Sequence, residues 1–314
     1  MNMFKPLLLA HHCAEDHPSH IAAELFAEGV ATRTHGQVQI SIYPKGALGE
    51  LPELLQLVID GRVDMSFPPH DRYVEHCKKF GCVSMPFVFD NFDHADRVVD
   101  GDFMDWVTPD LRQLGLEPLS CWDWGFRQFT NSKRPILRPE DMRGLRIRIP
   151  PVQTYKTAIL ALGGKIALVE YSQLARAMKL GMADGQENPI SVIYEQKLYE
   201  TQKFLSLVNY AYGSMVYIIN KKSFDALTQV QQQILREESK KAGQMMRQMI
   251  RVQEQQQLVA LARLGVQIVT PDAAPFKAAM APAYARLKES LGEEVVSPFL
   301  EMVEKSRRTL DAPG

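Results

Sequence analysis

The chain has 314 residues, with 36 lysines and arginines against 37 aspartates and glutamates and a formal net charge of −1. This length is long for a single core and predicts two lobes of ordinary domain size. The balanced charge excludes a strong electrostatic attraction to nucleic acid or to an acidic membrane surface. No apolar run reaches the roughly 18 to 20 residues of a membrane span, since even the run at residues 207–219 is interrupted by Asn209 and Gly213.

The first third of the chain alternates between strand and helix patterns. Apolar spacing predicts strands at residues 5–11 and 37–43, with a helix at residues 21–34 between them. After the break at Tyr43-Pro-Lys-Gly46, the pattern predicts a helix at 48–58, a strand at 63–67, helices near 93–107 and a strand at 116–121. This alternation predicts an α/β lobe that ends near residue 124.

The remaining sequence predicts a second lobe, and then a long helix. A strand at 145–149 precedes helices at 152–162 and 171–180, and a strand at 217–220 returns to the first lobe. Residues 229–264 contain no proline and predict one helix on the order of 50 Å long, enough to span both lobes. Its apolar residues keep no clean heptad, which favours packing on its own lobes over a dimeric coiled coil. After Gly265, residues 273–291 and 294–307 predict further helices.

Four cysteines, Cys13, Cys77, Cys82 and Cys121, form neither CxxC pairs nor a spacing typical of zinc ligands. We interpret them as packing thiols.

Two arginines about twenty residues apart in strand-like segments indicate an anion site. Arg127 lies in Trp124-Gly-Phe-Arg-Gln-Phe-Thr-Asn131, and Arg148 ends Gly144-Leu-Arg-Ile-Arg148. A guanidinium pairs with a carboxylate through two parallel charge-assisted hydrogen bonds. The structural alternative is a surface salt bridge, and Arg146 is expected on the same strand face as Arg148. Residues 184–189, Asp-Gly-Gln-Glu-Asn-Pro, are adequately explained as a turn.

The order of these segments, with TNSKRPI and PEDMRGLRIR between them and DGQENP after them, closely resembles the DctP-type solute-binding proteins of tripartite ATP-independent periplasmic (TRAP) transporters. The resemblance covers nearly the whole chain. It implies an α/β, two-lobed periplasmic-binding-protein-like fold with hinged lobes and a long spine helix spanning both. We expect the first lobe at residues 1–124 plus about 213–252, and the second at about 125–212 plus 253–314, with lobe closure around a ligand.

The resemblance also implies which residues contact the ligand. The main carboxylate-binding arginine corresponds to Arg148 and not to Arg146, a second ligand-facing arginine corresponds to Arg127, and Asn188 donates its amide to the ligand or holds the arginine pair. Asp184 and Glu187 are expected as structural partners, because carboxylates facing an anionic ligand would repel it. Further candidates occupy pocket or hinge positions of relatives, although each is also explained as core or surface: Tyr171, His12, Glu50, Pro69, His70, Tyr210, Tyr212 and Trp124. The segment Phe67-Pro-Pro-His70 departs from the small and acidic residues that many relatives have there.

A cluster of histidines and acids near the start of the chain raises the alternative of a metal site. We expect none, because His11 and His12 would point to opposite strand faces. We interpret the others, Glu15, Asp16, His17 and His20, as an exposed loop that leads into a helix.

These features predict an extracytoplasmic receptor that binds an organic-acid carboxylate and delivers it to a TRAP-type permease, where an ion gradient drives uptake. A hydroxylated acid or uronate is favoured over a dicarboxylate. We expect a monomer without cofactor, and no GxxxxGK[ST] phosphate loop occurs. Two alternatives remain open: a ligand sensor that presents its closed form to a signalling partner, and an enzyme with Cys121 or Cys13 as nucleophile, activated by His12.

The first six residues carry no secretory signal, which taken literally predicts a cytoplasmic protein. Because members of the family are exported, the resemblance instead implies a mature periplasmic chain whose signal is not part of this sequence.

Overall fold

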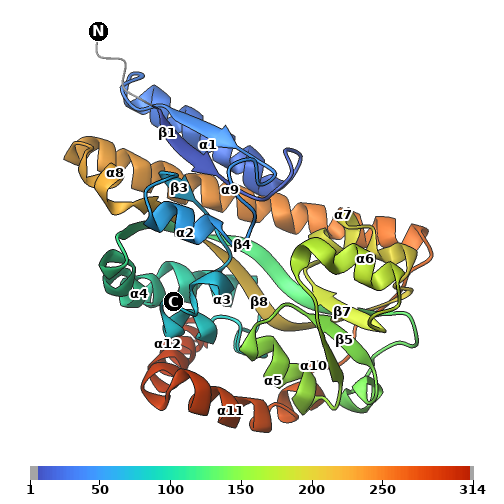
Figure 1. Ribbon diagram of the computed structural model, residues 1–314. Coiled ribbons are helices and arrows are strands. Elements are labelled where there is room, and N and C mark those ends of the chain that lie inside the picture. Colours follow the sequence, from blue (N-terminus) through green and yellow to red (C-terminus); the bar gives the residue numbers. More distant parts are fainter. Residues whose placement is uncertain (1–5, 312–314) are drawn as a thin grey trace. The chain divides into compact units, whose positions relative to one another are not determined.

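The computed structural model describes residues 6–311, so the expectations for the first five residues lie outside the described part. Its helices and strands are labelled in Figure 1. The chain divides into two compact units. Unit 1 contains the residues up to Phe80, Arg97–Asp123 and Ser214–Arg251, and unit 2 contains Gly81–Asp96, Trp124–Gly213 and the residues from Val252 on.

Residues 81–96 correct the predicted division, which had placed them in the first lobe. They belong to unit 2 because their polar groups bond there: the Phe87 N–H donates to the Tyr210 carbonyl at 2.7 Å, and His94 Nε2 lies 3.1 Å from the Val303 carbonyl. Both partners are distant in the sequence, so no local sequence pattern indicates that residues 81–96 belong to unit 2.

Unit 1 is built on a small mixed sheet in the order β2-β1-β3-β8. β1 (Leu7–Ala10) pairs in parallel with β2 (Ile40–Tyr43) and β3 (Met65–Ser66), and β3 pairs antiparallel with the end of β8 (Phe204–Asn220). The helices of this unit are α1 (Pro18–Arg33), α2 (Leu54–Ile59), α4 (Asp102–Gln113) and α8 (Lys221–Asp225). The predicted helix at 48–58 is shorter, because residues 48–53 form turns ahead of α2.

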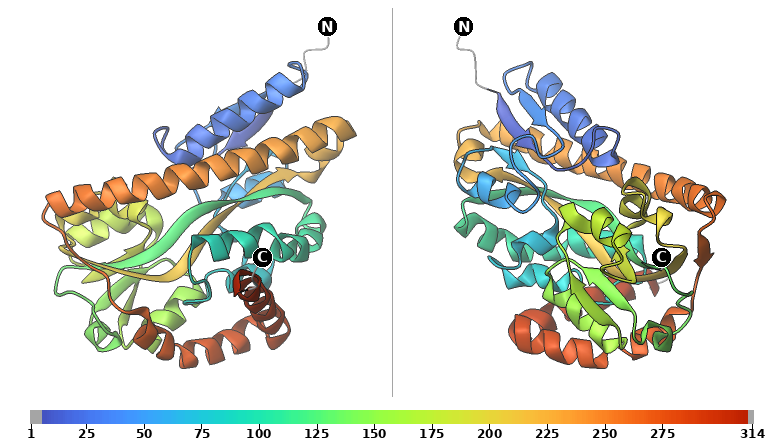
Figure 2. Two further views of the ribbon diagram at one scale, coloured as in Figure 1. Left: turned by 180° about the vertical axis from the view of Figure 1, so that it is seen from behind. Right: turned by 45° about the vertical axis from the view of Figure 1, so that its right-hand side comes forward.

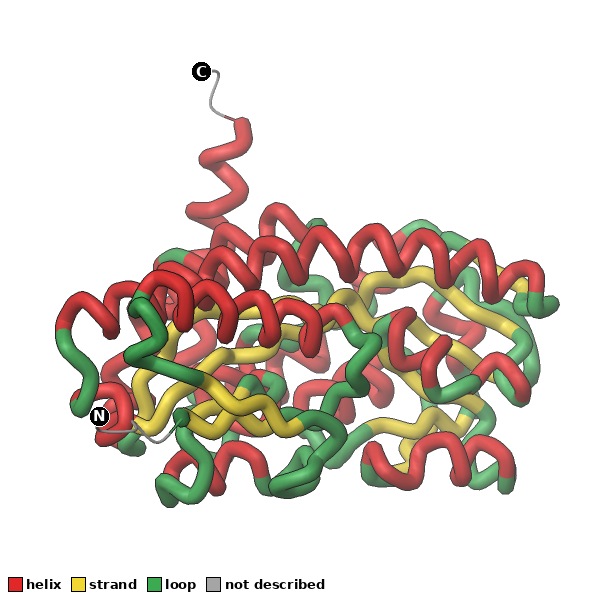
Figure 3. The backbone as a smooth tube through the Cα atoms, turned by 90° about the horizontal axis from the view of Figure 1, so that it is seen from above, coloured by secondary structure: helices red, strands yellow, loops and turns green. Residues whose placement is uncertain are grey.

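Unit 2 holds the second group of strands, in the order β4-β7-β5-β6. β5 (Arg146–Ile149) is parallel to both β6 (Lys165–Leu168) and β7 (Gly185–Asn188), and β7 is antiparallel to the second half of β4 (Leu116–Asn131). The short β9 (Gln267–Val269) pairs in parallel with the start of β8. The α-helices within this unit are α5 (Gln153–Ala161), α6 (Leu174–Lys179), α7 (Ile190–Glu195), α10 (Ala273–Ala278), α11 (Ala281–Leu291) and α12 (Glu293–Asp311), and Figure 3 shows helices bordering the strands.

Several elements contribute residues to both units, and three of them are long. The helix predicted at 229–264 is confirmed as α9 (Gln229–Arg263), 35 residues long, drawn in orange in Figure 2. β4 and β8 have 16 and 17 residues, whereas the sequence predicted only the fragments 116–121 and 217–220. The helix α3 (Phe92–Asp100) also crosses the boundary, between Asp96 and Arg97. Among residues 6–311, no helix is long and apolar enough to cross a membrane.

β7 corrects the turn predicted at residues 184–189. All four of its residues are buried, and hydrogen bonds join it to β4 on one side and β5 on the other. Gly185 permits this packing: a Cβ atom there would lie 2.3 Å from the Thr130 carbonyl oxygen and 2.8 Å from Asn131 Cβ. Backbone atoms of a neighbouring strand cannot move aside as a flexible side chain can.

We therefore expect Gly185→Ala to lower the free energy of unfolding by about 1–3 kcal/mol, as overpacking does in closely packed interiors. Chemical denaturation measures this. Ser132→Ala is the matched control on the neighbouring chain segment, because Ser132 is exposed and should stay within about 0.5 kcal/mol of the wild type. Equal stability of the two variants would contradict the role assigned to Gly185.

Candidate functional site

The polar residues of unit 2 meet because β7 lies between β4 and β5. In this register, Gln128 of β4 is opposite Asn188 of β7, and Gln186 of β7 is opposite Arg148 of β5. Arg127 immediately precedes Gln128. Three strands that are distant from one another in the sequence thus bring two arginines and an amide to one region of a sheet.

Arg127 is held by the carboxylate of Glu187. Its Nε donates to Glu187 Oε2 in a very short contact, and its Nη2 donates to Oε1 at 2.9 Å and to the Glu187 carbonyl at 3.0 Å. The guanidinium carbon also lies 4.5 Å from the centre of the Tyr155 ring. Burial acts to lower the pKa of Arg127, but the charge of Glu187 outweighs it and the pKa is raised well above its usual value. Arg127 is therefore a permanently charged partner in a closed ion pair.

Glu187 is the structural partner that the sequence predicted. It is fully buried, and the Tyr210 hydroxyl donates to its Oε2 at 2.6 Å. Tyr210 stacks on Phe129 with the ring centres 4.6 Å apart and is itself completely buried. The Tyr210 hydroxyl thus bonds to the ion pair, and the predicted contact of Tyr210 with the ligand stays a prediction.

Asn188 has its amide orientation fixed from both sides. Its Oδ1 accepts from Arg127 Nη2 at 3.2 Å, and its Nδ2 donates to Gln186 Oε1 at 2.5 Å. Gln186 Nε2 in turn donates to Thr130 Oγ1 at 2.8 Å. The amide thus holds Arg127, one of the two roles expected for it, and keeps one further N–H on Nδ2 for another acceptor.

Among residues 6–311, no carboxylate bonds to Arg148, in contrast to Arg127. Arg148 is 1% exposed, and its Nε donates to the Val169 carbonyl at 2.8 Å. Its Nη2 is buried and has no hydrogen-bond partner anywhere in residues 6–311. Burial lowers the pKa of Arg148 to about 10, against the opposing effect of the Glu187 charge. Arg146, two residues earlier, is exposed and donates to the Gly181 carbonyl at 2.7 Å, whereas Arg148 is buried.

Some of the aromatic residues of unit 2 that were predicted to contact the ligand lie in the hydrophobic core. Tyr212 is 1% exposed and packs against Phe89 and Phe126, with ring centres 5.5 and 5.3 Å away. Trp124 and Tyr171 meet edge to face at 6.4 Å, and Tyr171 is half-buried in the short 3₁₀ helix η4 (Tyr171–Gln173). Tyr171 also interacts electrostatically with Arg148. Of these three aromatic residues, Tyr171 is the one whose interaction with the guanidinium of Arg148 affects its pKa.

The predicted candidates of unit 1 fall into two groups. Glu50 is exposed, and its N–H bonds to Glu53 at 2.8 Å. Pro69 and His70 are buried beside β8: Pro69 forms a bridge with Met215, and His70 Nδ1 accepts the Ser214 N–H at 3.1 Å. The roles of these residues and of His12 toward a ligand stay predictions.

The histidines after β1 correct the exposed loop predicted there. His17 and His20 are 4% and 7% exposed, and His11 is fully buried with its Nε2 3.0 Å from His20 Nδ1. His17 caps α1, accepting the Ser19 N–H at 3.1 Å. Within the described residues, no group of three histidine, cysteine or acidic side chains could hold a metal ion.

Burial makes these histidines poor bases. It lowers the pKa of His11 to about 3, of His12 to about 3 and of His17 to about 4, assisted for His11 and His12 by neighbouring positive charges. The four cysteines are free and buried, and burial raises the pKa of Cys121 to about 12. They are packing thiols, as the sequence indicated.

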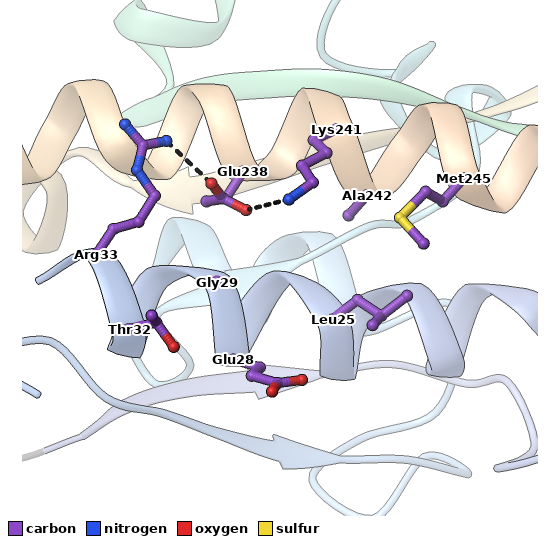
Figure 4. A pocket seen from close by; sticks show the side chains of 9 residues that line it. All are labelled: Leu25, Glu28, Gly29, Thr32, Arg33, Glu238, Lys241, Ala242 and Met245. Atoms are coloured by element: carbon purple, nitrogen blue, oxygen red, sulfur yellow. Dashed lines mark hydrogen bonds and ion pairs between the residues drawn. The ribbon is translucent and has the colours of Figure 1, made fainter.

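A surface groove of about 360 Å³ lies elsewhere in unit 1, between α1 and α9 (Figure 4). Arg33 of α1 binds Glu238 of α9 at 2.9 Å, and Glu238 packs against Gly29, where a Cβ atom would lie only 2.2 Å from its Oε2. None of the predicted site residues lines this groove.

Comparison with known proteins places the chain in a family. Residues 9–290 match the family described as bacterial extracellular solute-binding protein, family 7. The chain belongs to this family. This confirms the resemblance and the two-lobed α/β fold with a long helix that the sequence predicted, and the predicted receptor function is the one that the family performs with TRAP permeases.

Three relatives show the range of this likeness. The 2,3-diketo-L-gulonate-binding periplasmic protein YiaO of Escherichia coli is 28% identical, over 84% of this chain and 80% of its own. The C4-dicarboxylate-binding periplasmic protein DctP of Rhodobacter capsulatus is 28% identical over 69% and 66%. The crystal structure of the sugar acid binding protein DctPAm of Advenella mimigardefordensis with galactonate superposes with a TM-score of 0.89 at 28% identity, over 96% of this chain and 98% of the other.

Sequence reasoning did not single out Tyr155 and Gln186. Tyr155 covers the Arg127 guanidinium, and Gln186 orients the Asn188 amide. Gln186 lies inside the DGQENP string and alternates with Asn188, so a strand interpretation of that string would have put both on one face. Tyr155 lies on α5, seven residues after Arg148, with no signal beyond being aromatic.

The buried neutral histidines predict a loss of stability in acid. Their pKa values are lower in the folded protein than the usual 6.5, so the unfolded chain binds more protons below pH 6.5. The contribution is complete above pH 6.5 and is lost as the pH falls toward 3 to 4, at up to about 1.4 kcal/mol per pH unit for each histidine. Denaturant unfolding at pH 7, 6 and 5 measures it.

His17→Asn keeps a residue that caps helices well. It should lower by about one the number of protons that the chain takes up on unfolding in acid, and so reduce the slope of stability against pH. His35→Asn is the control, because His35 is exposed with φ of 51°, a conformation that asparagine tolerates. An unchanged pH slope in His17→Asn would contradict the assignment.

Proposed function

We propose that Arg148 is the carboxylate anchor of this receptor. The observation that carries the proposal is its buried Nη2, which has no partner among the described residues. A buried charge without its hydrogen bonds is costly, and a carboxylate would both neutralise the guanidinium and accept from it. Glu187 does not do so, because its oxygens already accept from Arg127 and Tyr210.

The remaining residues of the anchor region complete the carboxylate's bonds in this proposal. Asn188 supplies its second Nδ2 proton, Arg127 lies beside it, and the edge formed by Trp124 and Tyr171 contacts the carbon skeleton. The relatives support an organic acid as ligand, since each is named for a molecule that carries a carboxylate. His12, Glu50, Pro69 and His70 of unit 1 remain predicted contacts for the rest of the ligand.

The proposal includes binding without turnover. A thiol nucleophile needs its thiolate form, and the pKa of Cys121, about 12, opposes this at neutral pH. Cys13 Sγ lies 3.7 Å from His12 Nε2, but an imidazole with a pKa of about 3 is a weak proton acceptor. Neither thiol fits the enzyme alternative.

We also propose that the protein acts as a monomer in the periplasm, together with the subunits of a TRAP-type permease. The periplasmic relatives support the location. Leu235, Met246 and Leu261 of α9 are completely buried within the chain, which supports packing of this helix on its own protein instead of a dimeric coiled coil.

We expect Arg148→Met to remove ligand binding while the protein remains folded. Loss of one partner of a buried charge pair costs about 2–5 kcal/mol, so the Kd for a sugar acid should rise at least 30-fold. The unliganded variant should be as stable as the wild type or more so, because a buried unpaired charge is replaced by an apolar side chain. Calorimetry and ligand-dependent thermal unfolding measure the two effects.

Arg146→Met is the matched control, since Arg146 lies on the same strand and is exposed. It should bind as the wild type does. Affinity retained in Arg148→Met would remove Arg148 from the anchor role.

A further inference from the structure

A series of buried side-chain hydrogen bonds runs through unit 2 from Arg127 to Gln202, and we call it the amide relay. Arg127 Nη2 donates to Asn188 Oδ1 at 3.2 Å, and Asn188 Nδ2 donates to Gln186 Oε1 at 2.5 Å. Gln186 Nε2 donates to Thr130 Oγ1 at 2.8 Å, and the Thr130 hydroxyl donates to Gln202 Oε1 at 3.3 Å. All five side chains are buried within unit 2. Every bond of the amide relay thus has its donor on the Arg127 side.

The direction of the amide relay is fixed at the Arg127 end. A carboxamide can turn over and exchange its oxygen and its nitrogen, and a hydroxyl can rotate, so a series of such groups can run either way. A guanidinium has only donors. Arg127 therefore requires the oxygen of Asn188, which leaves Nδ2 with one proton for Gln186 and one for another acceptor.

Thr130 is the point at which this direction could be lost. Its hydroxyl both donates and accepts, and it reverses by rotating one proton. If the hydroxyl donated to Gln186, the carboxamide of Gln186 would turn over and present Nε2 to the Asn188 Nδ2, donor against donor. Gln202 Oε1 prevents this, because it accepts the hydroxyl proton on the opposite side. Gln202 is itself anchored, since its backbone N–H donates to the Leu198 carbonyl at 2.8 Å.

From this geometry we propose that Thr130 and Gln202 are positioning residues of the carboxylate site. They act through Gln186, and they hold the Asn188 amide in the one orientation that keeps an N–H of Nδ2 available to the ligand. A buried donor without an acceptor is costly, so the intact relay favours this orientation over a mixture of orientations. The inference rests on the proposed roles of Arg148 and Asn188 in binding.

Two variants of Thr130 separate its hydroxyl from its packing. Thr130→Val keeps the shape of the side chain and removes the hydroxyl, whereas Thr130→Ser keeps the hydroxyl and removes a methyl group. Calorimetry with galactonate, glucuronate and succinate follows whichever acid binds the wild-type protein most tightly. Thr130→Val should raise its Kd about 3- to 10-fold, the usual net value of one hydrogen bond, and Thr130→Ser should change it less than about twofold. Equal losses in the two variants would assign the effect to packing and overturn the proposal.

A double-mutant cycle shows whether Thr130 acts through Asn188. In an Asn188→Ala background, Thr130→Val should change the Kd less than about twofold, because the group that the relay orients is gone. A full further loss in this background would refute the relay. Thr157→Val is the matched control and should bind as the wild type does. Thr157 is a buried threonine of the same unit whose hydroxyl donates within its own helix, to the Thr154 carbonyl at 2.8 Å.

Arg148→Met distinguishes a failure of this inference from a failure of the proposed function. If an acid binds the wild-type protein but not Arg148→Met, unchanged affinity in Thr130→Val overturns the relay and leaves the anchor role standing. If none of the acids binds the wild-type protein, both are overturned. If Thr130→Val does not fold, Gln202→Met takes its place. It removes the acceptor of the Thr130 hydroxyl and should raise the Kd at least about twofold, and an unchanged Kd would refute the relay.

Discussion

The ion pair between Arg127 and Glu187 is the interaction on which the candidate site depends. It joins β4 to β7 inside unit 2, and both side chains are almost completely buried. A buried pair of this kind gains little net stability, because the desolvation of two charges offsets their attraction. It does fix position, since each partner satisfies the other only in one geometry. Tyr155, Tyr210 and Asn188 then take their orientations from it.

The pair also separates the roles of two arginines that look equivalent in the sequence. Both follow aromatic or apolar residues in strands, and both are buried. Arg127 has a bonded carboxylate and a raised pKa, while Arg148 has a carbonyl partner and a pKa lowered to about 10. The difference arises from register: Glu187 lies opposite Phe129, beside Arg127, and Gln186 lies opposite Arg148. A shift of one residue in β7 would exchange the carboxylate and the amide between the two strands.

Local sequence patterns predicted correctly the elements that bury one face and expose the other, because their apolar residues recur at a regular spacing. The long helix ends within one residue of the prediction, because it contains no proline and Gly265 follows its end; Gly243 lies within the helix without breaking it. The same patterns missed β7, in which four residues of mixed polarity, Gly-Gln-Glu-Asn, form a fully buried strand. Turn chemistry predicts a loop for such a string, and only the partner strands β4 and β5, both distant in the sequence, make a strand possible by satisfying its polar groups. The burial of His17 and His20 was missed for a similar reason. The positions of histidines in the sequence do not indicate which distant residues pack over their side chains.

The proposed role of Arg148 as carboxylate anchor came from the family resemblance, and the incomplete bonding of its buried guanidinium supports that role. A protein that bonded Arg148 internally, as it bonds Arg127, would have a more stable unliganded state. It would therefore gain less free energy by binding a ligand. Leaving one donor of a rigid, buried guanidinium unsatisfied keeps the unliganded state less stable at that point. Under this proposal, a group that is anionic and accepts hydrogen bonds removes the deficit, whereas a neutral sugar does not. Affinity for a carboxylate would then follow from one physical cause, the incomplete bonding of a cation that the sheet holds in place.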